Sequence, residues 1–315
     1  MKTKIVTAYW MDAEGLPFQG AYPVRKQRYL GSIIAHCQNT KLPVVCYTHQ
    51  KSLGELETIK KDFNLDNLEI KILELGEIKY HSEIDKIRNS DLETYIRELD
   101  GRGCEIMWGK FDALERELDG YDRVYWVDAG IQHPGIMTWG RSKKYNTPYD
   151  HHNPVHMTSW WTEYDVYNFP DFFNDKIFKK LDEICENKIH FITSNTPQIL
   201  YNIFNEKKII NTPINLPFPI GGMFGGDTKI LKKFIDNFWF LAEKIVNENV
   251  LVQEDCIMKP SFDMLNKNEK VEFLFTSWSC GEHDKFHFED WDESWGEPKP
   301  FYTVFNDILN YNDNE

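Results

Sequence analysis

The chain has 315 residues, of which 41% are hydrophobic, 27% charged and 15% aromatic, a composition typical of a folded globular protein rather than a disordered one. It carries 36 Lys and Arg against 50 Asp and Glu, a formal net charge of −14. A strongly acidic chain lacks the positive field that drives nucleic-acid binding. Nucleic acid is therefore disfavoured as a partner but not excluded, since a local basic groove is compatible with this total.

The N-terminal apolar run is too short for a signal peptide and is followed by Asp12 and Glu14. No run approaches the ~18 apolar residues of a membrane-spanning helix. The six cysteines show neither zinc-ligand nor redox spacing, which favours a reducing compartment. We expect a cytoplasmic protein without a membrane span; the sequence leaves its oligomeric state open.

The first half of the chain alternates strand-like and helix-like segments. Residue patterns predict strands at 5–10, 43–48, 68–75 and 124–127, and helices at 25–39, 53–63, 91–99 and 108–118. This alternation predicts an α/β fold with a Rossmann-like, mostly parallel central sheet flanked by helices. Neither a G-x-G-x-x-G after the first strand nor a Walker loop is present.

The second half begins with a long irregular stretch, 140–170, of a kind that is often functional. Beyond it we expect helices at 172–187, 197–205, 228–247 and 252–258, the last ending before Pro260, and strands at 189–193 and 271–276. We interpret the chain as a single domain. Its parts are a first half at 1–135, a second half at 136–290 and a tail at 291–315.

The segment 121–131, YDRVYWVDAGI, is the most informative one. An apolar run ends on Asp128, and an acid at the carboxyl end of a buried strand lies where open α/β sheets bind ligands. Ala129 and Gly130 leave room for a metal or a phosphate to approach the backbone. The structural alternative is an aspartate that caps a strand-end turn.

Other polar groups are candidates for the same site. The glycine-rich segment 221–226 either approaches a ligand or forms a tight turn whose Asp227 caps the next helix. Glu254 and Asp255 suit a general base, although acids at a helix start also favour the macrodipole. Candidates for phosphate, sugar or metal contacts, each with a plain surface role as its alternative, are Lys110, Arg28, His283 and His287.

In their order along the chain, WGKF, VYWVDAG, GGMFGGD and QED resemble the GT-A class of nucleotide-sugar glycosyltransferases, and most nearly the bacterial HtrL/YibB-like proteins. The resemblance runs from about residue 3 to about residue 290. It implies a GT-A sheet that binds a nucleotide sugar together with Mn²⁺ or Mg²⁺. Asp128 matches the metal-facing acid of the class's DxD motif, whose other acid this chain lacks.

The resemblance also assigns the remaining roles: residues 1–135 would form the nucleotide-sugar-binding half and residues 136–290 the acceptor-side half. Glu254 or Asp255 matches the acceptor-side acid, and His283 or His287 the C-terminal metal histidine of some members. The residues that it places around the donor are Thr7, Tyr9, Arg28, Thr48, Lys110, Asp128, Ala129, Gly130, Gly221, Gly222, Gly225, Gly226 and Asp227.

The resemblance thus implies a metal-assisted glycosyltransferase, with a UDP-sugar favoured as donor and a glycan or other hydroxyl as acceptor. Whether the reaction inverts or retains the anomeric configuration stays open. The first alternative is a non-catalytic glycan- or nucleotide-binding protein on a transferase fold, which the incomplete DxD motif supports. A second is nucleotidyl transfer, for which residues 12–20 are a poor match.

Overall fold

The structure is a computed structural model that describes residues 1–10, 22–90, 103–129, 174–194, 218–252, 254–275 and 303–312. The strands in this part of the chain are β1 (Thr3–Tyr9), β2 (Val44–Thr48), β3 (Leu68–Ile72), β4 (Arg123–Val127), β5 (Ile189–Ser194), β6 (Phe218–Asp227) and β7 (Lys270–Phe275). The α-helices are α1 (Tyr22–Asn39), α2 (Leu53–Asp62), α3 (His81–Arg88), α4 (Gly103–Glu115), α8 (Asp175–Ile184), α10 (Thr228–Asn247), α11 (Glu254–Asp263) and α12 (Thr303–Leu309). Short 3-10 turns are η2 (Gln50–Ser52), η3 (Leu75–Glu77) and η7 (Lys267–Glu269).

The described strands form one seven-stranded sheet in the order β3-β2-β1-β4-β6-β5-β7. Pairing is parallel between β3 and β2, β2 and β1, β1 and β4, and β5 and β7, whereas β6 runs antiparallel to both β4 and β5. All residues of β2 and β4 are buried, as expected of apolar strands covered on both faces. The predicted α/β class with a mostly parallel, helix-flanked sheet is confirmed.

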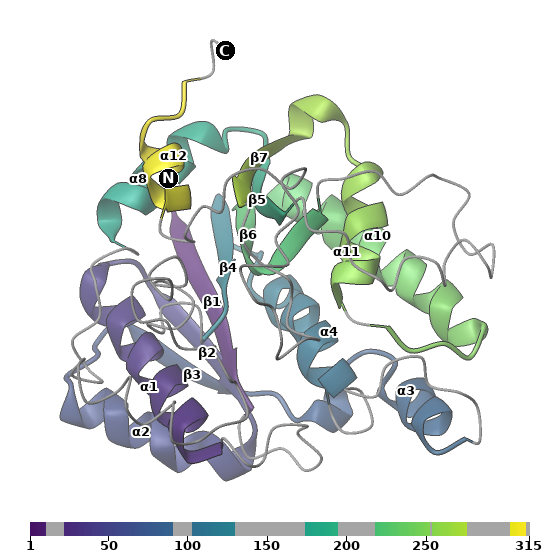
Figure 1. Ribbon diagram of the computed structural model, residues 1–315. Helices are drawn as coiled ribbons and strands as arrows, with labels where there is room; N and C mark the ends of the chain where they lie inside the picture. The colour runs from purple at the N-terminus through teal and green to yellow at the C-terminus, as the bar shows by residue number, and fades with distance from the viewer. Residues whose placement is uncertain are drawn as a thin grey trace, which may run out of the picture.

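Helices cover both faces of this sheet (Figure 1). One core lies between the sheet and α1, α2, α8 and α12, and the other lies between the sheet and α3, α4, α10 and α11. Successive strand residues point to opposite faces. Val124 and Trp126 therefore enter the α4 core, while Tyr125 and Val127 enter the α1 core.

The order of the strands reverses between β1 and β4. From β1 the chain proceeds to β2 and β3 on one side, and it then returns to place β4 on the other side of β1. In open α/β sheets, ligands bind outside the carboxyl ends of the strands at such a switch point. The residues that follow β1 and β4, among them Asp128, lie at this switch point.

The glycine-rich segment is a strand, so the alternative of a tight turn does not hold. Gly225 and Gly226 have φ of +145° and +143°, a region that side chains disfavour. An added Cβ on Gly225 would lie 2.3 Å from Val124 O, and one on Gly226 would lie 2.6 Å from Lys188 O. These two glycines let β6 lie tightly between β4 and β5. The Asp227 side chain accepts from the N–H groups of Lys229 and Ile230, so the predicted helix cap is confirmed.

Other differences from the predicted elements have local causes. Helix α11 continues through Pro260, which lacks an N–H and normally ends a helix. Its surroundings, residues 254–262, are buried throughout, and we attribute the continuation to this packing. Strand β3 ends at Ile72, and α3 and α12 were not predicted. The predicted helices at 91–99 and 197–205, and the loop 140–170, fall outside the described residues.

Strands from residues 1–135 and from residues 136–290 join the same sheet. Among the described residues, no helix has the length and apolar character that crossing a membrane requires.

Candidate active site at the carboxyl end of strand β4

Asp128 directly follows β4, and its main chain continues the strand pairing. Its N–H donates to the carbonyl oxygen of Gly222 on β6 at 2.8 Å. Its side chain lies on the same face as Trp126, two residues earlier, and the indole Nε1–H of Trp126 donates to Asp128 Oδ1 at 2.6 Å. The Asp128 side chain is still 41% exposed. The carboxylate is therefore held by the strand and open to solvent.

Lys110 reaches the same place from α4, with its side chain only 5% exposed. Its Nζ donates to Glu254 Oε1 at 2.6 Å and to the carbonyl oxygen of Gly221 at 3.1 Å, and it lies 3.6 Å from Asp128 Oδ1. An ammonium has three donors, and these three acceptors surround it. The structure thus places Lys110 inside the protein as a counter-charge, rather than on the surface as a direct ligand of a diphosphate.

Two acids begin α11 and close the cluster. Glu254 binds Lys110, and Asp255 Oδ1 accepts the N–H of Gly221 at 3.0 Å. A Cβ on Gly221 would lie 2.7 Å from Glu254 Oε1 and 2.7 Å from Lys110 Nζ. A side chain at this position would displace the ends of Glu254 and Lys110 and so disturb these contacts. The name polar cluster is used below for Lys110, Asp128, Gly221, Glu254 and Asp255.

The charged groups of the polar cluster shift one another's pKa values. Burial opposes the charged form of Lys110, but the negative charges of Asp128 and Glu254 outweigh it and raise the pKa of Lys110. Desolvation by the surrounding protein and the negative charge of Glu254 raise the pKa of Asp128. The ammonium of Lys110 and the hydrogen bond from the Trp126 N–H act in the opposite direction, but they do not cancel the rise. The exposure of the Asp128 side chain limits this rise, because water still solvates the carboxylate.

The chemistry of Asp128 fits one ligand of a hard divalent cation. Mg²⁺ in proteins is often bound through one or two carboxylates together with waters and substrate phosphates. Asp128 Oδ1 is engaged by Trp126, whereas Oδ2 has no protein partner among the described residues. That part of the chain contains no group of three or more His, Cys, Asp and Glu side chains arranged to hold a metal. A cation here would need ligands besides Asp128.

Three residues that the resemblance places around the donor, Thr7, Tyr9 and Thr48, are buried. Tyr9 OH donates to Glu55 Oε2 at 2.7 Å, and Thr48 Oγ1 donates to the carbonyl oxygen of Tyr9 at 2.6 Å. Thr7 is also fully buried, and its hydroxyl has no partner among the described residues. These side chains support the ends of β1 and β2 and offer almost no surface to a ligand.

The predicted glycine segment divides into two ends of β6. Gly221 and Gly222 lie beside Asp128, but Gly225, Gly226 and Asp227 pair with Tyr125, Val124 and Arg123. At ~3.3 Å per residue, Arg123 is roughly 16 Å from Asp128 along β4. Asp227 also forms an ion pair of 3.1 Å with Arg123. The structure therefore does not bring these three residues to the polar cluster.

Of the remaining predicted residues, the structure fully describes only Ala129, which is buried next to Asp128. Gly130, His283 and His287 lie outside the described residues, as does the side chain of Arg28 on α1.

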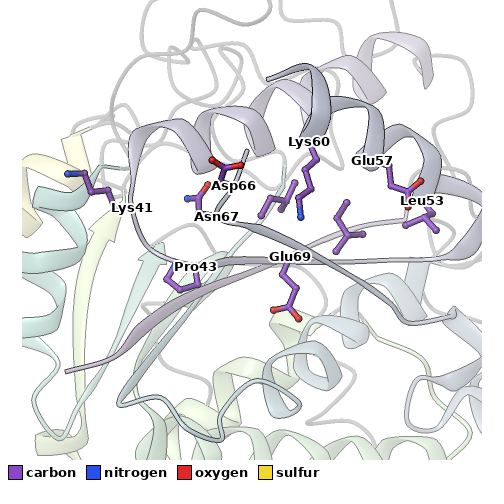
Figure 2. A pocket seen from close by; sticks show the side chains of 10 residues that line it. Lys41, Pro43, Leu53, Glu57, Lys60, Asp66, Asn67 and Glu69 are labelled. Carbon is purple, nitrogen blue, oxygen red and sulfur yellow. The ribbon is translucent and has the colours of Figure 1, made fainter. Parts of the chain in front are cut away.

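A cavity of about 660 Å³ lies elsewhere, between α2 and the edge strand β3 (Figure 2). Its lining includes Lys41, Lys60, Asp66 and Glu69. Lys41 and Asp66 precede β2 and β3, so this cavity reaches the amino ends of the strands, opposite to Asp128. None of the predicted site residues lines it, and we assign the chemistry to the polar cluster instead.

Sequence reasoning missed two groups that shape the site. Trp126 was interpreted only as part of an apolar strand; its place two residues before Asp128, on the same strand face, was the available signal. The second group is His36, whose Nε2 lies 3.4 Å from the carbonyl oxygen of Asp128. The two residues are separated by 92 positions in the sequence, so no local pattern indicates this contact.

Comparison with known proteins adds the following. No protein-family model matches the sequence, and neither does any curated protein. Mouse xyloside xylosyltransferase 1 in its apo form is similar in structure, with 8% identity, 95% of each chain covered and a TM-score of 0.45. The galactosyltransferase LgtC, solved with donor and acceptor sugar analogues, has 10% identity over 85% of this chain and 72% of its own, with a TM-score of 0.42.

A third similar structure is 4-diphosphocytidyl-2C-methyl-D-erythritol synthase from Anaerococcus prevotii, with 10% identity, 86% of each chain covered and a TM-score of 0.38. With identities this low and TM-scores below 0.5, these likenesses carry no argument about activity. The functional proposal below therefore depends on the polar cluster and on the sequence motifs.

Proposed function

We propose that the protein is a GT-A-type glycosyltransferase, related to the HtrL/YibB-like proteins, that moves a sugar from a nucleotide diphosphate sugar to an acceptor hydroxyl. The observation that carries this proposal is the position of Asp128. It is a partly exposed carboxylate at the carboxyl end of β4, beside the switch point of the sheet and in contact with a buried ammonium. A UDP-sugar is the favoured donor, on the sequence resemblance alone, and a cytoplasmic location is part of the same proposal.

The proposed reaction is substitution at the anomeric carbon. The acceptor oxygen forms a bond to that carbon while the bond to the diphosphate oxygen breaks, and the nucleoside diphosphate leaves with the bonding electron pair. If the configuration inverts, Glu254 or Asp255 takes the acceptor proton. Both carboxylates are held in place, one by Lys110 and the other by the Gly221 N–H, so a bound acceptor would meet preorganised groups.

Asp128 would hold Mn²⁺ or Mg²⁺, with His283 or His287 as the further ligand that the resemblance implies. Such an ion, when bound, supplies positive charge against the charge that develops on the leaving diphosphate. Gly222 and Ala129 would border the donor. Thr7, Tyr9 and Thr48 would support the floor of the donor site from within the core.

The test is a panel of UDP-, GDP-, CMP- and TDP-sugars, with and without Mn²⁺, measured by thermal shift and by release of the nucleotide. A ligand that binds the folded state raises the melting temperature by mass action. We expect one donor class to do so and to be slowly hydrolysed. Asp128→Asn, which keeps an oxygen for the Trp126 N–H, should remove hydrolysis while the protein stays folded.

The outcomes separate the alternatives. A donor that stabilises the protein without any turnover, with acceptors supplied, would favour the non-catalytic binding protein. Release of pyrophosphate from a nucleoside triphosphate would favour nucleotidyl transfer. Undiminished turnover by Asp128→Asn would contradict the assignment of Asp128.

A further inference from the structure

The indole of Trp126 is fixed by its surroundings. The side chain is 3% exposed and is part of the core formed with α4, α10 and α11. Its Nε1–H points at Asp128 Oδ1, 2.6 Å away, which is short for an N–H to a carboxylate and is typical of a charge-assisted hydrogen bond. The orientation of the Asp128 carboxylate is therefore set by a ring that cannot move without disturbing the core.

Lys110 approaches the same oxygen from another side. Its Nζ lies 3.6 Å from Asp128 Oδ1 and 5.7 Å from the centre of the Trp126 ring. Because Glu254 and the Gly221 carbonyl oxygen bind Lys110 more closely, the ammonium does not move onto Asp128. Oδ1 is directed inward by both groups, and Oδ2 is left on a side chain that is 41% exposed.

We propose that Trp126, assisted by Lys110, is a positioning residue that fixes Asp128 so that it offers a single oxygen, Oδ2, to a divalent cation. This inference depends on the cation that the proposed function includes, and it assigns a role to residues that touch neither donor nor acceptor. Without the indole N–H, the carboxylate is free to rotate, so that Oδ2 can also turn toward Lys110 and tighten the existing 3.6 Å ion pair at the expense of the cation. Loss of such an outer hydrogen bond typically lowers metal affinity 10–100-fold.

The test is a titration with Mn²⁺ alone, followed by electron paramagnetic resonance of the free ion, without any sugar donor or acceptor. Trp126→Phe keeps an aromatic ring in the core but removes the N–H, and we expect a roughly 10–100-fold weaker Mn²⁺ affinity. Trp239→Phe is the matched control. Trp239 on α10 is likewise 3% exposed and packs in the same core as Trp126. The Trp239→Phe variant should bind Mn²⁺ within about twofold of the wild type, and Asp128→Asn should lose the site.

A second measurement needs no change at Trp126. In protein labelled with ¹⁵N-indole tryptophan, Asp128→Asn should displace one indole N–H signal, that of the ring bonded to Asp128. In the wild type, Mn²⁺ should broaden that same signal before the other indole signals. This measurement holds even if Trp126→Phe does not fold.

Two results would overturn the inference. One is an Mn²⁺ affinity of Trp126→Phe equal to that of the control; the other is the absence of Mn²⁺ binding in the wild type. If the wild type transfers sugar in the presence of a chelator, the proposed function survives and the inference fails. If Mn²⁺ binding follows the expected order but no nucleotide sugar is bound or turned over, the cation site stands and the proposed function fails.

Discussion

Replacing Lys110 by Met tests the central contact of the polar cluster. Methionine keeps most of the length and apolar volume of the lysine but removes its charge. The side chains of Lys110 and Glu254 are 5% and 11% exposed, so Glu254 would be left almost buried without its partner. Removing one member of such a pair costs about 3–5 kcal/mol of unfolding free energy, or roughly 6–20 °C in melting temperature.

The chain offers a matched control for this change. Lys259 is equally buried, at 3%, but its partner Asp263, 2.7 Å away, has a side chain that is 34% exposed. Water can solvate Asp263 once the lysine is gone, so Lys259→Met should cost about 1 kcal/mol or less. The double variant Lys110→Met/Glu254→Gln should recover much of the loss, because its glutamine carries no charge to be stranded.

Equilibrium unfolding in urea at neutral pH measures all four proteins. The folded pKa of Lys110 is raised above its ordinary value of about 10.5. Its contribution is therefore complete below that value and is lost only as the pH rises through the higher, folded pKa. The reasoning fails if Lys110→Met unfolds within ~1 kcal/mol of the wild type, below the range for a broken buried pair. It fails too if the double variant is no more stable than Lys110→Met.

Two further predictions concern the sheet. Gly225→Ala would place a Cβ 2.3 Å from Val124 O at a φ of +145°, and strain plus overpacking should destabilise the protein by roughly 2–6 kcal/mol. The control is Gly54→Ala on α2, where nothing lies within 4 Å of the added Cβ; this variant should be neutral or stabilising. Equal effects of the two substitutions in urea unfolding would contradict this account. Burial lowers the pKa of His190 to about 4 from the ordinary 6.5, so stability should fall as the pH drops from about 6.5 toward 4, by at most ~3 kcal/mol from this group. His190→Gln should have a flatter decline over that range, and an unchanged decline would show that other groups cause it.

The part of the fold that was predictable from sequence is the part that local patterns encode. The apolar run before Asp128 and the helical stripes of α1, α2, α4 and α10 have the periods of a buried strand and of amphipathic helices. The acid at the end of β4 followed from the same reasoning. Pro260 shows the limit, because tertiary packing outweighs a local rule and the helix continues through it.

The polar cluster itself depends on distant pairing. Lys110 and Glu254 are separated by 144 positions, and no spacing in the sequence indicates that α4 and α11 converge at the same end of β4. The glycine segment was a candidate for the correct region, but the physical reason differs between its ends. Gly221 makes room for the charged side chains, whereas Gly225 and Gly226 let neighbouring strands approach. Composition alone cannot separate these two causes.

The net charge of the polar cluster constrains how a donor could bind beside it. Asp128, Glu254 and Asp255 are three acids against one ammonium, so their formal charges sum to −3 + 1 = −2. A diphosphate placed near Asp128 would meet repulsion on the order of 1–4 kcal/mol per charge pair at ~4 Å, depending on the local dielectric. Lys110 does not relieve this repulsion for the donor, because its donors already face Glu254, Gly221 and Asp128. Under the proposed function, the donor and a cation on Asp128 therefore each lower the cost of binding the other. Linkage makes that coupling reciprocal, so the burial of Lys110 is itself a reason to expect donor and cation to bind together.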